Sequence, residues 1–510
     1  MIARVNASAV LGIDAYAVQV EVDISGGFPG FQIVGLPDAA VNESRERVRS
    51  AIKNSGFHFP TTKITVNLAP ADVKKEGPIF DLPLAIGILA ASGQVSAMHL
   101  ANYIIIGELS LDGHLRPVSG VLPIAINARQ EKKAAILCPA ENAREAAVVG
   151  DVNVFPVASL RETVEALGQT GDREPFCLSE KEKADLEVVY SDDFADVKGQ
   201  EHVKRAMEVA AAGGHNVILV GPPGSGKTML ARRLPTILPA LTRDEALEVT
   251  KLYSVCGLLP RQASLLSARP FRSPHHTISD AGMIGGGAVP RPGEVSLAHT
   301  GILFLDELPE FKRDVLEVLR QPLEDGMVTI SRAAASLTYP ARLTLVAAMN
   351  PCPCGFFMDA IKQCTCAPLQ IQKYLMRISG PLLDRIDIHI EVPRLRYEDL
   401  SSARAGEASA NIRDRVTRAR QVQTKRFSGT KLHCNAHMQS KQIRQYCGVD
   451  DSVRDLLRSA VAQLNLSARA YDRILKLSRT IADLDGTERI GVAHVAEAVQ
   501  YRSLDRKLWG

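Results

Sequence analysis

One stretch of the sequence has the residue types and spacing of a phosphate-binding loop. An apolar run, Val217–Val220, precedes Gly221–Thr228, which reads GPPGSGKT and fits the pattern G-x-x-x-x-G-K-[ST]. Glycines let the backbone wrap a polyphosphate with its N–H groups pointing inward, and the N-terminus of a following helix adds positive potential. A chance Gly-rich turn is disfavoured because a strand precedes the loop and a helical pattern follows it. The spacing predicts a site for a nucleoside triphosphate such as ATP.

The loop residues have distinct expected roles. Lys227 is expected to meet the β- and γ-phosphates, and Thr228 to place its hydroxyl on Mg²⁺. The residues expected to contact the nucleotide here are Gly221, Pro222, Pro223, Gly224, Ser225, Gly226, Lys227, Thr228 and Met229.

A second apolar run, 301–305, ends in two carboxylates, Asp306 and Glu307. A buried strand that ends this way can hold Asp306 on the hydrated Mg²⁺ and Glu307 near the attacking water. The alternative is a core strand that happens to end in acids. A third run, 342–349, ends at Asn350.

These motifs and their order resemble AAA+ ATPases. The resemblance implies that Asn350 is the sensor 1 residue that orients water, and that Gln200 lies near the adenine. The segment around Arg385 resembles MCM helicases and magnesium-chelatase motor subunits, which implies an arginine finger acting in trans; the alternative is a surface arginine paired to Asp384 or Asp387. Arg469 resembles a sensor 2 residue that touches the nucleotide of its own subunit.

Four cysteines lie close together in the sequence. Cys352, Cys354, Cys364 and Cys366 form C-x-C-x9-C-x-C, which predicts a structural tetrahedral Zn²⁺ site, with reduced free thiols as the alternative. The other five are scattered and predicted to be buried: Cys138, Cys177, Cys256, Cys434 and Cys447.

Two segments of the ATPase module read as insertions. The Gly- and Pro-rich stretch 273–299 is long enough to be functional, and we expect it to project into a ring's pore with Arg291 as a phosphate contact. His275 and His276 are adjacent, and adjacent histidines usually point apart, so a metal site there is disfavoured. The stretch 328–340 reads as a hairpin before the sensor 1 strand. Related helicases carry a basic residue at this tip against DNA, and Arg332 occupies that place.

Composition narrows the class of protein. The 510 residues suffice for about three domains, and the formal net charge of +3 means that nucleic-acid contacts must come from local patches. The sequence has no membrane-spanning apolar run and no secretion signal, so we expect a cytoplasmic protein without membrane contact.

The chain divides by pattern into an α/β region 1–165, a linker 166–192, an AAA+ core 193–395 with a cysteine-bearing insertion at 351–368, and a helical lid 396–510. In the first region we expect strands at 17–22, 31–34, 64–68 and 103–106 and helices at 39–55 and 83–91. This region resembles the S5-like α+β proteolytic domain of Lon and its relative in RadA. The positions of Lon's nucleophile and base fall on Ile79 and near Ile124, so we expect a non-proteolytic domain.

Long motifs, among them GGHNVILVGPPGSGKTMLA, AAMNPCPCG and ISGPLLDRIDIH, resemble the magnesium-chelatase-like YifB/ComM family over essentially the whole chain. The resemblance implies an α/β multidomain protein: a Lon-like domain, an αβα AAA+ core with helix-2 and pre-sensor-1 insertions, and a lid. It implies a homohexameric ATP hydrolase and DNA helicase. Such a ring would drive branch migration on single- and double-stranded DNA in homologous recombination during natural transformation, with recombination proteins as further partners. The alternative is a chelatase-type ATPase that remodels a protein partner.

Overall fold

The computed structural model describes residues 2–509 apart from 134, 169–172, 180–187, 189, 261–262, 288, 333–335, 360, 396–405 and 465–466. The chain folds into two compact units. Unit 1 comprises Met1–Leu186 and Thr242–Ser267, and unit 2 comprises Glu187–Leu241 and Ala268–Gly510. Part of the expected linker 166–192 (169–172, 180–187 and 189), and the first residues of the expected lid (396–405), lie outside the described residues.

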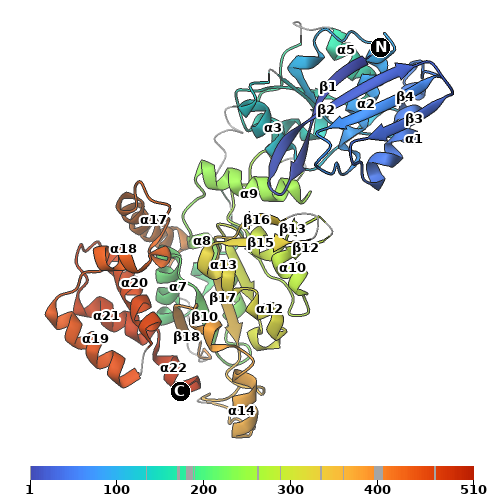
Figure 1. Ribbon diagram of the computed structural model, residues 1–510. Helices are drawn as coiled ribbons and strands as arrows, with labels where there is room; N and C mark the ends of the chain where they lie inside the picture. Colours follow the sequence, from blue (N-terminus) through green and yellow to red (C-terminus); the bar gives the residue numbers. More distant parts are fainter. Residues whose placement is uncertain are drawn as a thin grey trace. The chain divides into compact units, whose positions relative to one another are not determined.

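Unit 1 is built on a seven-stranded mixed sheet with the order β3-β4-β2-β1-β5-β8-β9 (Figure 1). β1 and β2 pair antiparallel, and burial alternates along both strands, so one face of the sheet carries the core. The four strands predicted for this region overlap β2, β3, β4 and β5. The strands are β1 (Ile2–Leu11), β2 (Asp14–Ser25), β3 (Gly30–Val34), β4 (Lys63–Ala69), β5 (Tyr103–Ile105), β8 (Ala135–Pro139) and β9 (Asn153–Val157).

Helices pack on this sheet, and α2 is buried along its whole length. Ile79 and Ile124 both belong to the hydrophobic core, so they offer neither a nucleophile nor a base where the Lon resemblance would need them. The predicted helices 39–55 and 83–91 correspond to α1 and α2. The helices are α1 (Ala39–Asn54), α2 (Asp81–Ala91), α3 (Val121–Gln130), α4 (Ala143–Ala147) and α5 (Leu160–Gly168).

Unit 1 also contains a segment from much farther along the chain, Thr242–Ser267, which we call the arm. Its helix α9 (Arg243–Val255) begins with a capping box, which satisfies N-terminal N–H groups that would otherwise lack acceptors. At the other end the carbonyl of Ser254 accepts a hydrogen bond from the Gly120 N–H at 3.1 Å, and the Ser254 hydroxyl donates to buried Glu145. Two leucines of the arm pack against the core of unit 1: Leu247 and Leu265. The motif pattern, which assigned 193–395 to one module, did not predict this arrangement.

Unit 2 contains a five-stranded parallel sheet with the order β11-β14-β17-β10-β18. Its central strands are buried on both faces, as their unbroken apolar runs require. Because the strands are parallel, the residues that follow them meet at one edge of the sheet. The strands are β11 (Phe271–Arg272), β14 (Ile302–Leu305), β17 (Thr344–Met349), β10 (Val217–Val220) and β18 (Ile388–Glu391).

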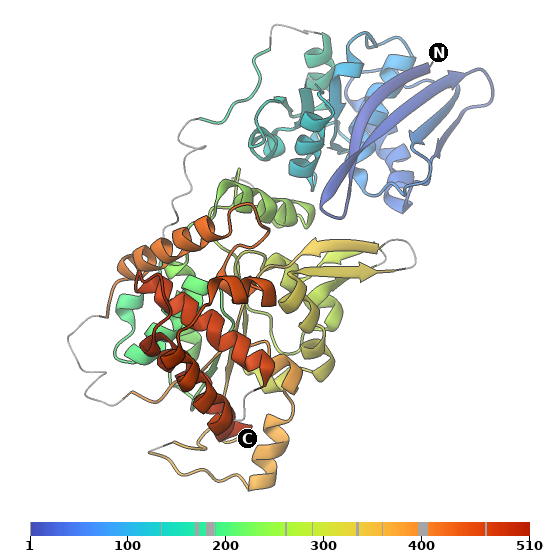
Figure 2. The same cartoon turned by 60° about the vertical axis from the view of Figure 1, so that its left-hand side comes forward.

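The C-terminal helices share their hydrophobic core with the sheet. Side chains of α17 and α20 join those of α7, α8 and the central strands in one buried cluster, so the region expected as a separate lid is packed on the ATPase core (Figures 1 and 2). None of the helices that the structure describes is long and apolar enough to span a bilayer. The helices of the ATPase core that take part in this packing are α7 (Glu201–Gly213) and α8 (Lys227–Ile237). The C-terminal helices are α17 (Ser409–Arg426), α18 (Ser440–Tyr446), α19 (Asp451–Leu464), α20 (Ala468–Leu484), α21 (Val492–Gln500) and α22 (Ser503–Leu508).

Two hairpins interrupt the alternation of strands and helices. The first, β12 (Gly285–Gly286) with β13 (Arg291–Pro292), lies within the predicted insertion 273–299. The second, β15 (Met327–Ser331) with β16 (Ser336–Pro340), is the hairpin predicted before the sensor 1 strand; its two strands are yellow in Figure 2. Short helices complete the unit: α10 (Asp280–Ile284), α11 (Glu294–Leu297), α12 (Arg313–Glu317), α13 (Arg320–Asp325), α14 (Pro368–Leu375) and α15 (Gly380–Leu383).

Candidate active site

The phosphate loop, Gly221–Thr228, leaves the carboxyl end of β10 and opens α8. Gly224 and Gly226 have φ angles of 77° and 90°, in the region that favours glycine. A Cβ on Gly221 would lie 2.2 Å from the Val392 carbonyl oxygen, so a side chain cannot be accommodated there. The loop therefore depends on its glycines, and the N–H groups at the start of α8 form a site for an anion.

The Lys227 ammonium lies inside the loop. It donates hydrogen bonds to the carbonyl oxygens of Gly221 (2.7 Å) and Pro222 (3.0 Å) and to Asn350 Oδ1 (3.2 Å). Burial lowers the pKa of Lys227 to about 8, although nearby carboxylates oppose this shift. A bound polyphosphate would give the ammonium anionic acceptors in place of the two carbonyls.

Beside the lysine, an oxygen pair fits a magnesium ion. Thr228 Oγ1 donates to Asp306 Oδ2 at 2.7 Å, which brings the hydroxyl of the phosphate loop to the carboxylate that follows β14. Mg²⁺ prefers oxygen ligands and is commonly held by one or two protein groups together with water and phosphate. The two side chains are therefore suited to hold Mg²⁺ on a bound nucleotide.

Glu307 is held by its backbone in an uncommon conformation. Its φ is 53°, in the left-handed region, and its N–H donates to Asp306 Oδ1 at 3.0 Å. Its carboxylate is 59% exposed and therefore accessible to water. Nδ1 of His276 lies 3.8 Å from Glu307 Oε2. The sequence did not predict this neighbour, because the two residues are far apart in the chain.

Two polar residues from other segments of unit 2 lie against the phosphate loop, Asn350 after a strand and Gln200 at the start of α7. Asn350 follows β17, which lies between β14 and β10, so its side chain reaches Lys227. Gln200 is buried and donates through Nε2 to the Ser225 carbonyl (2.9 Å) and the Pro393 carbonyl (3.0 Å). Both residues therefore lie against the loop, in positions compatible with the predicted roles.

The four clustered cysteines converge, and their sulfur atoms all lie within 4.8 Å of one another. Three Sγ–Sγ distances are 3.4, 3.6 and 3.7 Å. A tetrahedral ion with Zn–S bonds of about 2.3 Å has S–S edges of about 3.8 Å, so the cluster fits such an ion and is too open for disulfides. Backbone N–H groups lie within 3.4 Å of three sulfurs, an outer shell typical of thiolate sites.

The remaining cysteines only partly match the prediction that they are buried. Cys138, Cys434 and Cys447 are buried. The prediction was wrong for Cys177, which is exposed, and for Cys256, which is half-buried. Their surroundings lie in loops, where an isolated cysteine gives no sequence signal of burial.

Arg385 and Arg469 act on one carboxylate. Arg385 forms an ion pair with Glu324 of α13 rather than with Asp384 or Asp387, the partners that the sequence suggested. The hydrogen bond and charge of Arg385, with further contributions from Arg469 and Arg320, hold the pKa of Glu324 below its usual range. Arg385 is therefore the ion-pair partner of Glu324, and Arg469 affects this carboxylate through its charge alone.

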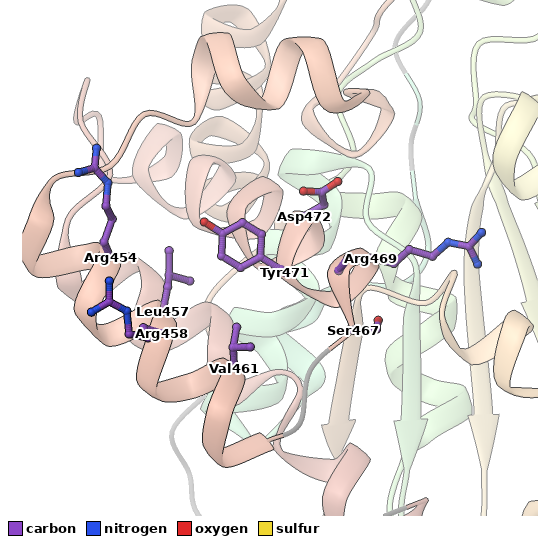
Figure 3. Close-up of a pocket in the computed structure, with 9 residues that line it drawn as sticks. Arg454, Leu457, Arg458, Val461, Ser467, Arg469, Tyr471 and Asp472 are labelled. Atoms are coloured by element: carbon purple, nitrogen blue, oxygen red, sulfur yellow. The ribbon is translucent and has the colours of Figure 1, made fainter.

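Arg469 also borders an open groove of about 580 Å³ between α19 and the start of α20. In Figure 3 its side chain extends away from the other labelled residues of this groove. The groove is lined by both apolar and charged residues: Arg454, Leu457, Arg458, Val461, Ser467, Ala468, Arg469, Tyr471 and Asp472.

A buried polar cluster joins the ATPase core to α20. Asp387, just before β18, lies 3.1 Å from His215 Nδ1 and 3.3 Å from Arg473 Nε, and His215 Nε2 lies 2.8 Å from Thr480 Oγ1. Burial favours a higher pKa for Asp387, but the hydrogen bond from His215 and the charge of Arg473 hold its pKa well below the usual range. Sequence reasoning missed this cluster because its members come from three distant segments.

The two predicted basic contacts lie on neighbouring hairpins. Arg291 pairs with Gly286 across β12–β13, and Arg332 Nη2 lies 3.6 Å from the place a Cβ on Gly286 would occupy. Both arginines are exposed. The buried Tyr339 hydroxyl donates to the Pro290 carbonyl at 2.6 Å and thereby ties the second hairpin to the first insertion. The hairpins together present a basic surface that is positioned by protein contacts.

Sequence comparisons now identify the family. Residues 193–400 match the family described as "Magnesium chelatase, subunit ChlI", 20–142 match "Subunit ChlI of Mg-chelatase", and 406–502 match "Magnesium chelatase, subunit ChlI C-terminal". Competence protein ComM of Haemophilus influenzae is 46% identical over 514 residues, which cover 99% of this chain and 98% of that protein. The chain belongs to the magnesium-chelatase-like YifB/ComM family. YifB of Escherichia coli is 45% identical over 506 residues, covering 99% of this chain and 97% of YifB.

Membership of the YifB/ComM family indicates an ATPase that uses ATP and Mg²⁺, in agreement with the loop geometry. A more distant relative, Lon protease 2 of Bacillus subtilis, is 31% identical over 157 residues, which cover 29% of this chain and 28% of that protein. This partial likeness fits the Lon-like region expected from the sequence.

Proposed function

We propose that this YifB/ComM family member is a subunit of a hexameric, ATP-driven motor that moves on DNA in the cytoplasm. The observation that carries the proposal is the convergence, in unit 2, of a complete nucleotide site with two joined hairpins that expose Arg291 and Arg332. The full-length likeness to competence protein ComM supports a role in natural transformation. We propose branch migration of the strands that are exchanged in homologous recombination, together with recombination proteins.

In this proposal the chain's own residues carry out hydrolysis as follows. The phosphate loop and Lys227 bind the triphosphate, and Thr228 and Asp306 hold Mg²⁺, which neutralises phosphate charge. Glu307 accepts a proton from the attacking water, and Asn350 orients that water. Gln200 lines the side of the site next to the adenine.

Arg385 would stabilise the charge that develops on the γ-phosphate of a neighbouring subunit. For Arg469 we propose contact with the nucleotide of its own subunit, the role expected from the sequence; its charge also lowers the pKa of Glu324, the ion-pair partner of Arg385. Release of Glu324 would accompany formation of the subunit interface.

The basic hairpins would grip the phosphate backbone. Such contacts are largely independent of sequence and weaken as salt rises, because each neutralised phosphate releases counterions. Loss of one contact is expected to lower the salt dependence of binding by about one unit of the log–log slope. Hydrolysis would move the hairpins and with them the DNA.

The experiment that tests the proposal is the ATPase rate with and without single-stranded, duplex and four-way-junction DNA, measured while oligomer size is followed. DNA should raise the ATPase rate of the wild-type protein.

The Glu307→Gln variant should bind ATP and assemble but should not hydrolyse ATP, since the amide cannot accept the proton. Arg332→Ala should weaken DNA binding and leave the basal ATPase rate intact. A normal rate in Glu307→Gln would refute the catalytic assignment.

A second candidate function is ATP-driven remodelling of a protein partner, which the matches to magnesium-chelatase subunits favour. Stimulation of the ATPase by a protein partner, and by none of the three DNA substrates, would favour this second function.

Proteolysis is disfavoured because Ile79 and Ile124 are buried in the core. A casein-degradation assay should show no cleavage.

A further inference from the structure

The cysteine-bearing loop starts at the nucleotide site. Cys352 lies two residues after Asn350, and Cys366 lies two residues before Pro368, the first residue of α14. Burial raises the pKa of the Tyr374 hydroxyl on α14, and the nearby backbone of Asn350 opposes this shift. The proposed water-orienting residue therefore lies next to both ends of the cysteine-bearing loop.

Inside the loop, Gly355 packs directly on the phosphate loop. A Cβ on Gly355 would lie 2.5 Å from Pro223 Cδ, 2.8 Å from Pro223 Cγ and 3.8 Å from Asn350 Cγ. The Gly355 N–H donates to the Cys352 carbonyl at 3.0 Å, and its φ is 85°. The turn that brings two cysteine ligands together is thus the same turn that supports Pro223.

On its other side the loop is held against the exit of β18. The Phe356 ring centroid lies 4.1 Å from Lys362 Nζ and 5.0 Å from Arg394 Cζ, and Arg394 Nε lies 3.1 Å from Asp359 Oδ2. Arg394 follows Pro393, whose carbonyl accepts the hydrogen bond from Gln200. The cysteine loop therefore contacts both the phosphate loop and the segment that follows β18.

The shape of the loop depends on side-chain contacts and turns rather than on regular secondary structure. The described residues between Pro351 and Ala367 form neither helix nor strand, and Cys352 is the one cysteine of the four that is buried. Four thiolates select soft ions of the zinc class, and a structural ion of this kind contributes its binding energy to folding. Without an ion, the four sulfurs have no strong interaction that keeps them together.

We propose that a zinc-class ion on Cys352, Cys354, Cys364 and Cys366 sets the position of Pro223 and Asn350, so that metal binding and nucleotide binding are coupled. The proposal rests on the proposed nucleotide site and adds a second ligand that controls it. Coupling is reciprocal: if the ion strengthens nucleotide binding, the nucleotide strengthens binding of the ion by the same free energy.

The first test uses the full chain in its zinc-loaded form and after treatment with a zinc-selective chelator, with excess Mg²⁺ in both samples. Binding of a fluorescent ADP analogue should weaken by about 5-fold or more on zinc removal and recover when zinc is returned. Zinc release to a chromogenic chelator should be slower with ADP–Mg²⁺ present. Neither nucleotide binding nor zinc release depends on the catalytic activity of the protein.

The second test separates the contact from the ion. Gly355→Ala adds a methyl group against Pro223 and should keep one zinc ion per chain while weakening nucleotide binding. Gly429→Ala is the matched control, since Gly429 has a similar φ of 77° but no atom within 4 Å of the added Cβ. It should leave both zinc content and nucleotide affinity at wild-type values.

The outcomes separate this inference from the proposed function. If zinc-free protein binds nucleotide as tightly as zinc-loaded protein, and ADP leaves the zinc release rate unchanged, the coupling is refuted while the nucleotide site stands. If the zinc-loaded wild-type protein binds no nucleotide, the proposed function itself fails. Equal effects of Gly355→Ala and Gly429→Ala would contradict the role of the Pro223 contact.

Discussion

At the scale of single residues, Lys227 makes nucleotide binding depend on pH. Its pKa is lowered to about 8 in the free protein, so above pH 8 the free lysine is mostly neutral. A bound triphosphate favours the charged form and raises the pKa again. We therefore expect ATP binding to take up a proton at pH 9 but not at pH 7, and affinity to fall as pH rises above 8.

Calorimetric titration of ATP in two buffers of different ionisation enthalpy measures that proton directly. Lys227→Arg is the control, because a guanidinium stays charged throughout this range and residual binding should take up no proton. Equal proton uptake at pH 7 and pH 9 in the wild-type protein would contradict the assignment.

Asp387 is expected to matter for stability rather than for chemistry. Asp387→Asn removes the negative charge between His215 and Arg473 and leaves a buried guanidinium without its counter-charge. Breaking a buried pair from one side costs about 3–5 kcal/mol. Urea unfolding should show this loss, whereas Asp455→Asn, at an exposed ion pair, should change stability by less than about 1 kcal/mol. Similar losses in both variants would exclude a special role for the cluster.

The residues of the nucleotide site could be predicted because each belongs to a local motif with its own spacing. Lys227, Thr228, Asp306 and Asn350 meet because parallel strands end at one edge of the sheet. Glu324 and Asp387, in contrast, owe their roles to partners that only tertiary packing brings near, and no local pattern identifies such partners.

At the scale of elements, strands and helices with clear periodicity were predicted well, and the placement of α9 was not. The pattern of α9 predicts a helix but not the unit on which it packs. The decisive contacts, Ser254 with Glu145 and Gly120, join residues more than a hundred positions apart.

These contacts give a prediction for the arm. Ser254→Ala removes a donor from Glu145, a buried carboxyl whose pKa burial raises. Loss of one hydrogen bond to a buried group costs about 1–3 kcal/mol. Hydrogen exchange of α3 and α9 should become faster, while β10 and β17 keep wild-type protection. Ser96→Ala, at an exposed serine of unit 1, should change neither; faster exchange there as well would contradict the prediction.

At the scale of the whole molecule, the proposed ring predicts complementation between two inactive variants. Glu307→Gln lacks the base of its own site but retains Arg385, and Arg385→Ala has the opposite defect. In rings assembled from an equal mixture, about a quarter of the interfaces combine both intact groups. Phosphate release should therefore reappear at about that fraction of the wild-type rate.

A mixture of Glu307→Gln with Lys227→Ala is the matched control, because both changes damage the same side of the interface and no combination restores it. No activity in the first mixture would place Arg385 in the site of its own subunit, and activity in the control would mean that Glu307 and Lys227 do not serve the same site.

The arm also determines where this chain can be divided. A cut near residue 187 separates most of unit 1 from unit 2, but Thr242–Ser267, which belongs to unit 1, then stays in the fragment that contains unit 2. That fragment would carry Leu247 and Leu265 without the core they pack against, and unit 1 would have lost a helix. A soluble ATPase fragment therefore requires a short linker in place of the arm, and a soluble unit 1 requires the arm fused to its end.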